Sequence, residues 1–154
     1  MKGAVLTGAT LTRADFSGAK LGGARLDRCS AVHLTCTEAD LGGADLSGAD
    51  LRETNFLAAS LREVVAVGAR LERALCNGAD FSAANLSSVR ARWVSLAHAQ
   101  LAGTDFRSAD LRGANFHRAQ DAEARYDGAR LEGSRRTDAD LAEAEDFQPP
   151  AAGA

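Results

Sequence analysis

A five-residue period runs through this chain from Leu6 to Leu141 without a change of register. Every fifth residue in that span belongs to a central column of 28 positions, of which 15 are Leu and five are Phe. A second column, two places earlier, is mostly Ala. An amphipathic helix repeats its apolar residues at three and four positions and a half-buried strand at two, so neither has a period of five. The period therefore predicts a different regular chain path.

Each repeat predicts a short strand fragment followed by a turn. Residues two places apart lie on the same face of an extended segment, so both columns are expected to point inward from a strand of about three residues. Twelve of the 15 glycines, from Gly3 to Gly133, stand two places after the central residue. Gly accepts the positive φ that a type II turn requires. The Asp and Asn residues between the columns are expected to bond neighbouring backbone groups, so their presence needs no catalytic explanation. They include Asp45, Asp50, Asn55, Asp80, Asn85, Asp105, Asp110 and Asn115.

Pentapeptides such as ADLGG, ADLSG, ADLRE, ADFSA and ADLRG resemble the pentapeptide-repeat family, whose motif is Ala-(Asp/Asn)-Leu-X-X. The resemblance covers nearly the whole chain and implies an all-β fold, a right-handed quadrilateral parallel β-helix with four pentapeptides per coil. The 28 units then make about seven coils, stacked at the inter-strand spacing of about 4.8 Å. We expect one domain over residues 1–146 and a short disordered tail over residues 147–154.

Composition and cysteine usage indicate a cytoplasmic protein. The net charge of −3 is too small for overall charge to select nucleic acid or membrane as a partner. No signal-peptide apolar segment follows Met1, and no long uncharged apolar run occurs. Cys29, Cys36 and Cys76 all fall in the inward columns, and their odd number fits a reducing compartment better than a disulfide framework. We therefore expect no direct nucleic acid binding and no membrane partner.

Residue types that carry catalysis are scattered. His33, His98 and His117 are expected on different corners and sides, without the spacing of metal ligands. There is no nucleophile elbow and no phosphate-binding Gly loop, because the glycines are dispersed turn residues. We expect no enzyme activity, no cofactor and no metal.

Asp121 and Arg136 are the two charges in the central column, where an unpaired buried charge is costly. Two alternatives explain them. In the first, the two side chains pair with each other or are solvated where the last coils loosen. In the second, residues 117–138 leave the coil and form a functional bulge. We favour the first alternative because the column resumes at Tyr126 and Leu131.

The outward charges, sorted by the four sides, predict a rod that is polarised across its width. The basic side, centred on Leu11, Leu51 and Leu111, carries eight arginines and five carboxylates, a net charge of +3. The acidic side, centred on Leu21, Leu61 and Leu101, carries two cations and six carboxylates, a net charge of −4. The six carboxylates are Asp40, Glu63, Asp80, Glu123, Asp140 and Glu143.

The resemblance implies one specific function. Quinolone-resistance and toxin-immunity members of the family are rods whose acidic surface imitates duplex DNA and binds type II topoisomerase, that is DNA gyrase or topoisomerase IV. The acidic side is the partner-binding site under this hypothesis, since a basic protein cradle selects negative charge.

A structural scaffold or adaptor with no topoisomerase role is the alternative. Its partner-binding site would be the basic side around the outward Trp93, with Arg70, Arg90, Arg92 and Arg112. An end-to-end homodimer is also expected, because no leader segment precedes the first coil to cover its edges.

Overall fold

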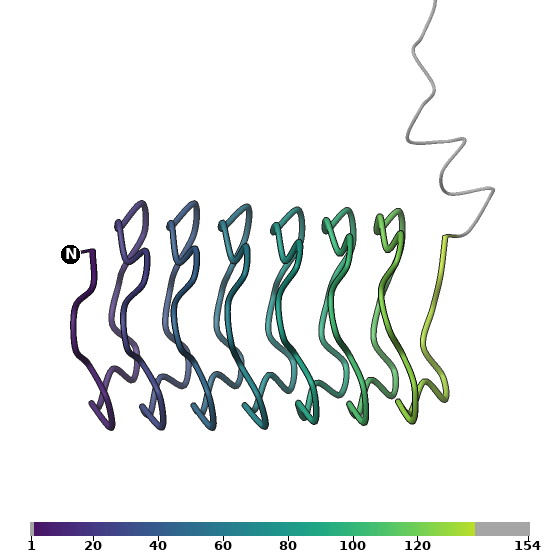
Figure 1. Cartoon of the computed structure of the whole chain (residues 1–154), viewed down its shortest axis with the longest axis horizontal. Helices are drawn as coiled ribbons and strands as arrows, with labels where there is room; N and C mark the ends of the chain where they lie inside the picture. Colours follow the sequence, from purple (N-terminus) through teal and green to yellow (C-terminus); the bar gives the residue numbers. More distant parts are fainter. Residues whose placement is uncertain (1, 138–154) are drawn as a thin grey trace, which may run out of the picture.

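The computed structural model describes residues 2–137, and the chain follows one path throughout them: successive coils stacked along a straight rod (Figure 1). This part of the chain contains no helix and no continuous strand, only single parallel bridges between residues 20 apart, from Val5 with Arg25 to Asn115 with Arg135. Four pentapeptides therefore complete one coil. The right-handed sense of the coils stays a prediction. The count of about seven coils also stays a prediction, because residues 138–154, which include part of the expected domain and its tail, lie outside the described residues.

Neighbouring coils are joined by backbone hydrogen bonds on both flanks of each bridging residue. The Leu26 amide donates to the Asp45 carbonyl at 2.7 Å, and the Arg25 amide donates to the Ala4 carbonyl at 2.8 Å. The strand fragments are shorter than the three residues expected, because only the residue between the two inward columns forms a bridge. The remaining residues of each pentapeptide are used to turn the corner.

The corners confirm the predicted turn. At the corner that contains Gly8, the Ala9 amide donates to the Leu6 carbonyl at 3.0 Å, and this i to i+3 bond recurs along the rod. The residue two places after the centre has a positive φ at every corner from Gly3 to Gly133, at 12 glycines and at 15 residues of other types. Gly is therefore favoured there but not obligatory, because the left-handed conformation costs other residues only about 1–2 kcal/mol.

The core is a continuous apolar column inside the coils. Phe56, Phe106 and Phe116 are its largest fully buried side chains, and the Ala column lies beside them. All three cysteines are buried as predicted, and burial raises the pKa of the Cys76 thiol to about 12. Because thiolate is suppressed, these cysteines are apolar filling and not reactive groups.

The outward Asp and Asn residues bond the backbone at the corners as expected, with one exception. Asp45 accepts a hydrogen bond from the Ser47 amide at 2.9 Å, and Asn85 accepts one from the Ser87 amide at 3.1 Å. Asp50 instead binds the Arg52 side chain through both carboxylate oxygens, each at 2.7 Å. Asp50 therefore takes part in the ion pairs on the surface of the basic side.

Asp121 and Arg136 pair within the rod, which confirms the favoured alternative. The regular bridges continue through Asn115 with Arg135, so residues 117–137 do not leave the coil. Arg136 donates to the Asp121 carboxylate, and the Tyr126 hydroxyl donates to the same carboxylate at 2.9 Å. The Arg136 guanidinium also lies 5.1 Å from the centre of the Phe116 ring. The pair thus covers the aromatic end of the core in the described part of the chain.

Candidate functional site

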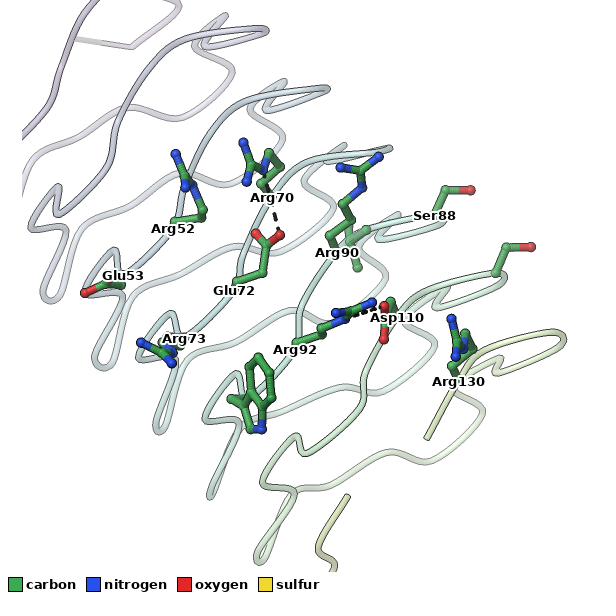
Figure 2. A pocket seen from close by; sticks show the side chains of 13 residues that line it. Arg52, Glu53, Arg70, Glu72, Arg73, Ser88, Arg90, Arg92, Asp110 and Arg130 are labelled. Carbon is green, nitrogen blue, oxygen red and sulfur yellow. Dashed lines mark hydrogen bonds and ion pairs between the residues drawn. The ribbon is translucent and has the colours of Figure 1, made fainter. Parts of the chain in front are cut away.

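A concavity of about 750 Å³ lies on the basic side and extends over the corner before it. We call it the arginine–tryptophan groove, and Figure 2 shows its side chains projecting from successive coils. Six arginines and three carboxylates line it, a net charge of +3. The lining residues are Arg52, Glu53, Arg70, Glu72, Arg73, Ser88, Val89, Arg90, Arg92, Trp93, Ser108, Asp110 and Arg130.

The 20-residue coil period gathers these residues from distant parts of the sequence. Arg70, Arg90, Asp110 and Arg130 occupy the same position in successive coils, since each is bridged to the next. At about 4.8 Å per coil, Arg70 and Arg130 are on the order of 14 Å apart along the rod. Charge therefore forms rows parallel to the rod axis.

Part of the positive charge is neutralised within the basic side itself. Asp50 chelates Arg52, and these hydrogen bonds hold the pKa of the Asp50 carboxyl below its ordinary value. Asp110 accepts from Arg92 at 2.7 Å and from Arg112 at 2.8 and 2.7 Å. Such short charge-assisted bonds hold these three arginines in place on the basic side.

Other arginines of the groove keep donors for a partner. Arg90 is exposed and makes no ion pair within residues 2–137. The Arg70 guanidinium is only loosely associated with its neighbours, at 3.6 Å from Asp50 and 3.7 Å from Glu72. These separations exceed the 2.7–2.9 Å range of strong charge-assisted bonds. In Figure 2 the Arg70 and Arg90 head groups point the same way from neighbouring coils.

Trp93 supplies an aromatic surface at the edge of the groove. Its side chain points outward as predicted, and the residue is 58% exposed. The Arg73 guanidinium, on the preceding coil, lies 5.7 Å from the centre of the indole ring, within cation–π range. On the following coil, a Cβ added at Gly113 would lie 2.5 Å from the indole Cδ1 and 2.7 Å from Nε1. The absent side chain of Gly113 is what leaves space for the ring.

The sequence-based site on the basic side is brought together in large part. Arg70, Arg90, Arg92 and Trp93 line one groove, whereas Arg112 lies beside it and holds Asp110. Sequence reasoning missed three contributors to the groove: Val89 of the basic side, and Ser88 and Ser108 of the neighbouring side. It also missed the contact of Gly113 with Trp93. Stacking the turn positions at 20-residue intervals would have found Gly113, because it follows Trp93 by one coil.

The carboxylates of the acidic side share that side but are dispersed. Asp40 and Asp80 occupy one row with Ser60 between them, and Glu63 and Glu123 are exposed three coils apart. Arg62 forms an ion pair with Asp80 at 2.9 Å. Asp140 and Glu143 lie outside the described residues. None of these carboxylates is among the residues that line the groove.

The expectation that the histidines fall on different sides is wrong for one pair. His98 and His117 lie on the same side, with ring centroids 5.6 Å apart in an edge-to-face arrangement. Across residues 2–137 no group of three or more His, Cys, Asp or Glu side chains is placed to hold a metal ion. The same residues include no helix that would cross a membrane.

Comparison with known proteins identifies the family to which this fold belongs. A family model described as "Pentapeptide repeats" matches residues 1–30, 35–65, 67–96 and 92–120, with eight copies of the repeat. No curated protein matches the chain. Among solved structures, the pentapeptide repeat protein Rfr23 from the cyanobacterium Cyanothece 51142 aligns at 24% identity with a TM-score of 0.59, over 61% of this chain and 64% of Rfr23. The chain thus spans less than two thirds of that relative.

Two further matches have lower structural similarity. HetL from Nostoc sp. strain PCC 7120, a pentapeptide repeat protein involved in regulation of heterocyst differentiation, aligns at 26% identity over 88% of this chain and 84% of its own, with a TM-score of 0.25. QnrB1, a plasmid-mediated fluoroquinolone resistance protein, aligns at 22% identity over 93% of this chain and 88% of its own, with a TM-score of 0.31. The family model covers most of the sequence, and the chain belongs to the pentapeptide-repeat family.

Proposed function

We propose that this chain is a non-enzymatic binding protein, a scaffold or adaptor whose partner is another protein and whose binding site is the arginine–tryptophan groove. One observation carries the proposal: an exposed Trp93 and a surplus of arginines share a single concave surface of about 750 Å³. Tryptophan and arginine are the residue types that most often dominate the binding energy of protein interfaces.

The chemistry of the groove suits recognition better than catalysis. No histidine, cysteine or lysine is among the residues that line it. Two of its carboxylates lie beside arginines: Glu72 is 3.7 Å from Arg70, and Asp110 is held by Arg92 and Arg112. Paired carboxylates of this kind are poor general bases, because their charge is already stabilised by the guanidinium groups.

Affinity capture with three forms of the full chain tests the adaptor function. A partner bound by the wild-type chain should be lost with Trp93→Ala and retained with Arg107→Gln. Arg107 is an exposed arginine that is paired with Asp105 and is not among the residues that line the groove. The recovered partner is then purified and titrated against the same three forms by calorimetry. Equal binding by all three would place the partner site elsewhere and refute the proposal.

Topoisomerase binding through the acidic side is a second proposal. It is supported by the exposed Glu63 and Glu123 and by Asp40 on the same side of the rod, while the Arg62 ion pair with Asp80 weakens the negative field. If it is correct, micromolar protein should inhibit supercoiling by DNA gyrase or protect it from a quinolone. The double charge reversal Asp40→Lys with Glu63→Lys should abolish the effect. An unaffected enzyme with the wild-type chain would exclude this function.

An end-to-end homodimer and a cytoplasmic location remain part of the proposal. Light scattering on the purified chain should give the mass of a dimer, and a monomer mass would refute the first. Localisation of a fluorescent fusion checks the second.

A further inference from the structure

We infer that the arginine–tryptophan groove takes an acidic polypeptide segment, one with several carboxylates and an apolar side chain that contacts the edge of the Trp93 indole. This inference rests on the proposed adaptor function and adds the chemical class of the partner. Three features of the groove support it: guanidinium groups without strong ion pairs, an indole whose ring is partly covered by its two neighbours, and carboxylates that interrupt the arginines.

The arginines that remain available for a partner indicate the charge and the length of the ligand. Arg90 has no ion pair within the described residues, and Arg70 is only loosely associated with Asp50 and Glu72 at 3.6 and 3.7 Å. Arg130 is 4.0 Å from Glu132. These three lie in one row that spans about 14 Å, a distance that about five extended residues cover. A guanidinium fork matches a carboxylate in two parallel hydrogen bonds, so a short acidic segment satisfies the row.

The surroundings of Trp93 favour contact at the edge of the ring over stacking on its face. Arg73 lies over the ring at 5.7 Å from the preceding coil, and Gly113 approaches the ring atoms from the following coil. The residue is nevertheless 58% exposed, so part of the indole stays accessible. An aliphatic side chain needs only such a partial surface, whereas a nucleic acid base needs an open ring face.

The carboxylates in the groove also argue against nucleic acid. Glu53, Glu72 and Asp110 interrupt the arginines, and the groove carries a net charge of only +3. A duplex places one phosphate charge about every 1.7 Å along its axis and would bring several phosphates against these acids. A polypeptide can place its carboxylates only where the arginines are, and neutral residues opposite Glu53, Glu72 and Asp110.

The single tryptophan of the chain allows a direct test, because all indole fluorescence comes from Trp93. The full chain is titrated with a synthetic peptide of about twelve residues that is rich in Asp and Glu and contains one Leu. The same peptide with Asn and Gln in place of the acids, and an oligothymidylate, serve as comparison probes. The acidic peptide should change the Trp93 emission saturably, with an affinity that falls as salt rises. The amide peptide should produce no change, and the oligothymidylate should bind more weakly.

A matched pair of variants locates the binding. Arg90→Gln should raise the Kd for the acidic peptide about tenfold, the effect of removing charged hydrogen bonds. Arg107→Gln, outside the groove, should leave the Kd unchanged. The inference is overturned if the acidic peptide causes no change, if oligothymidylate binds more tightly, or if both variants weaken binding equally. A captured protein partner that requires Trp93 but is not displaced by the acidic peptide would also overturn it, while leaving the adaptor function intact.

Discussion

Replacing Gly113 by alanine should move the Trp93 indole, and the cost can be estimated from the structure. The added Cβ would lie 2.5 Å from Cδ1 and 2.7 Å from Nε1, closer than atoms approach without displacement. Gly113 also has a φ of +69°, which costs an alanine about 1–2 kcal/mol. Loss of the contact between Arg73 and the ring adds about 0.5–1 kcal/mol. The free energy of unfolding should therefore fall by about 2 kcal/mol in total.

Gly103→Ala separates the two contributions. Gly103 has a φ of +66° at the same turn position, and no atom lies within 4 Å of an added Cβ. This control should show the conformational cost of about 1–2 kcal/mol without any displacement of the indole. Urea unfolding gives the free energies, and Trp93 emission reports the environment of the ring. Only Gly113→Ala should alter the native emission spectrum.

A double-mutant cycle completes the measurement. In a Trp93→Ala background the ring is absent, so Gly113→Ala should cost no more than Gly103→Ala, with unfolding followed by circular dichroism. Identical emission and identical free energies for the two alanine variants in the wild-type background would show that Gly113 does not position Trp93. The account of the groove edge would then be wrong.

Three other predictions concern the rod itself. Phe56→Ala should lower the free energy of unfolding by about 3–5 kcal/mol, because the ring is fully buried. Leu57→Ala, at a residue that is 45% exposed, should change it by less than about 0.5 kcal/mol. Comparable losses for the two variants in urea unfolding would contradict the assigned core. Cys76, whose pKa burial raises to about 12, should resist iodoacetamide at about pH 8 in the native chain and react after unfolding, as mass spectrometry would reveal. Burial alone would raise the pKa of Asp121, but hydrogen bonds from Arg136 and Tyr126 lower it below the ordinary value of 3.8. The ionised carboxylate therefore stabilises the folded chain above pH 3.8, and this stabilisation is lost as the pH falls through the folded pKa. Asp121→Asn should therefore destabilise at pH 7 and have a smaller effect in acid, and a difference in unfolding free energy that does not vary with pH would refute the ion pair.

Most of the fold could be predicted because the period is local and each pentapeptide repeats the same physical task. The inward columns, the corners and the outward position of Trp93 all follow from position within the repeat. Position within the repeat does not specify pairing between charges. Asp50 and Asp45 hold equivalent places in the motif, yet Asp50 binds Arg52 while Asp45 bonds a backbone amide. Where an arginine stands two places later, as at Arg52 and Arg107, its side chain also binds the carboxylate, and turn propensity does not predict that ion pair.

The candidate site was predictable as a side but not as a groove. Sorting by side identified the arginines near Trp93, but not which of them are already neutralised. Arg92 and Arg90 are only two residues apart, and Asp110 binds the first and leaves the second available. The histidine expectation failed for a related reason: residues 19 apart lie on adjacent coils, so His98 and His117 meet despite their separation in the chain.

The sequence by itself determined the repeat, its inward and outward faces, and the column of apolar side chains, because these depend on contacts within five residues and on burial of Leu, Phe and Ala. Only the tertiary structure decided how side chains 18 to 20 residues apart divide the available charge and space. Trp93 lies where it does because Gly113 has no side chain one coil later, and Arg90 is available because Asp110 is occupied by Arg92 and Arg112. Both outcomes depend on contacts between successive coils. A pattern within five residues does not specify how side chains of different coils meet.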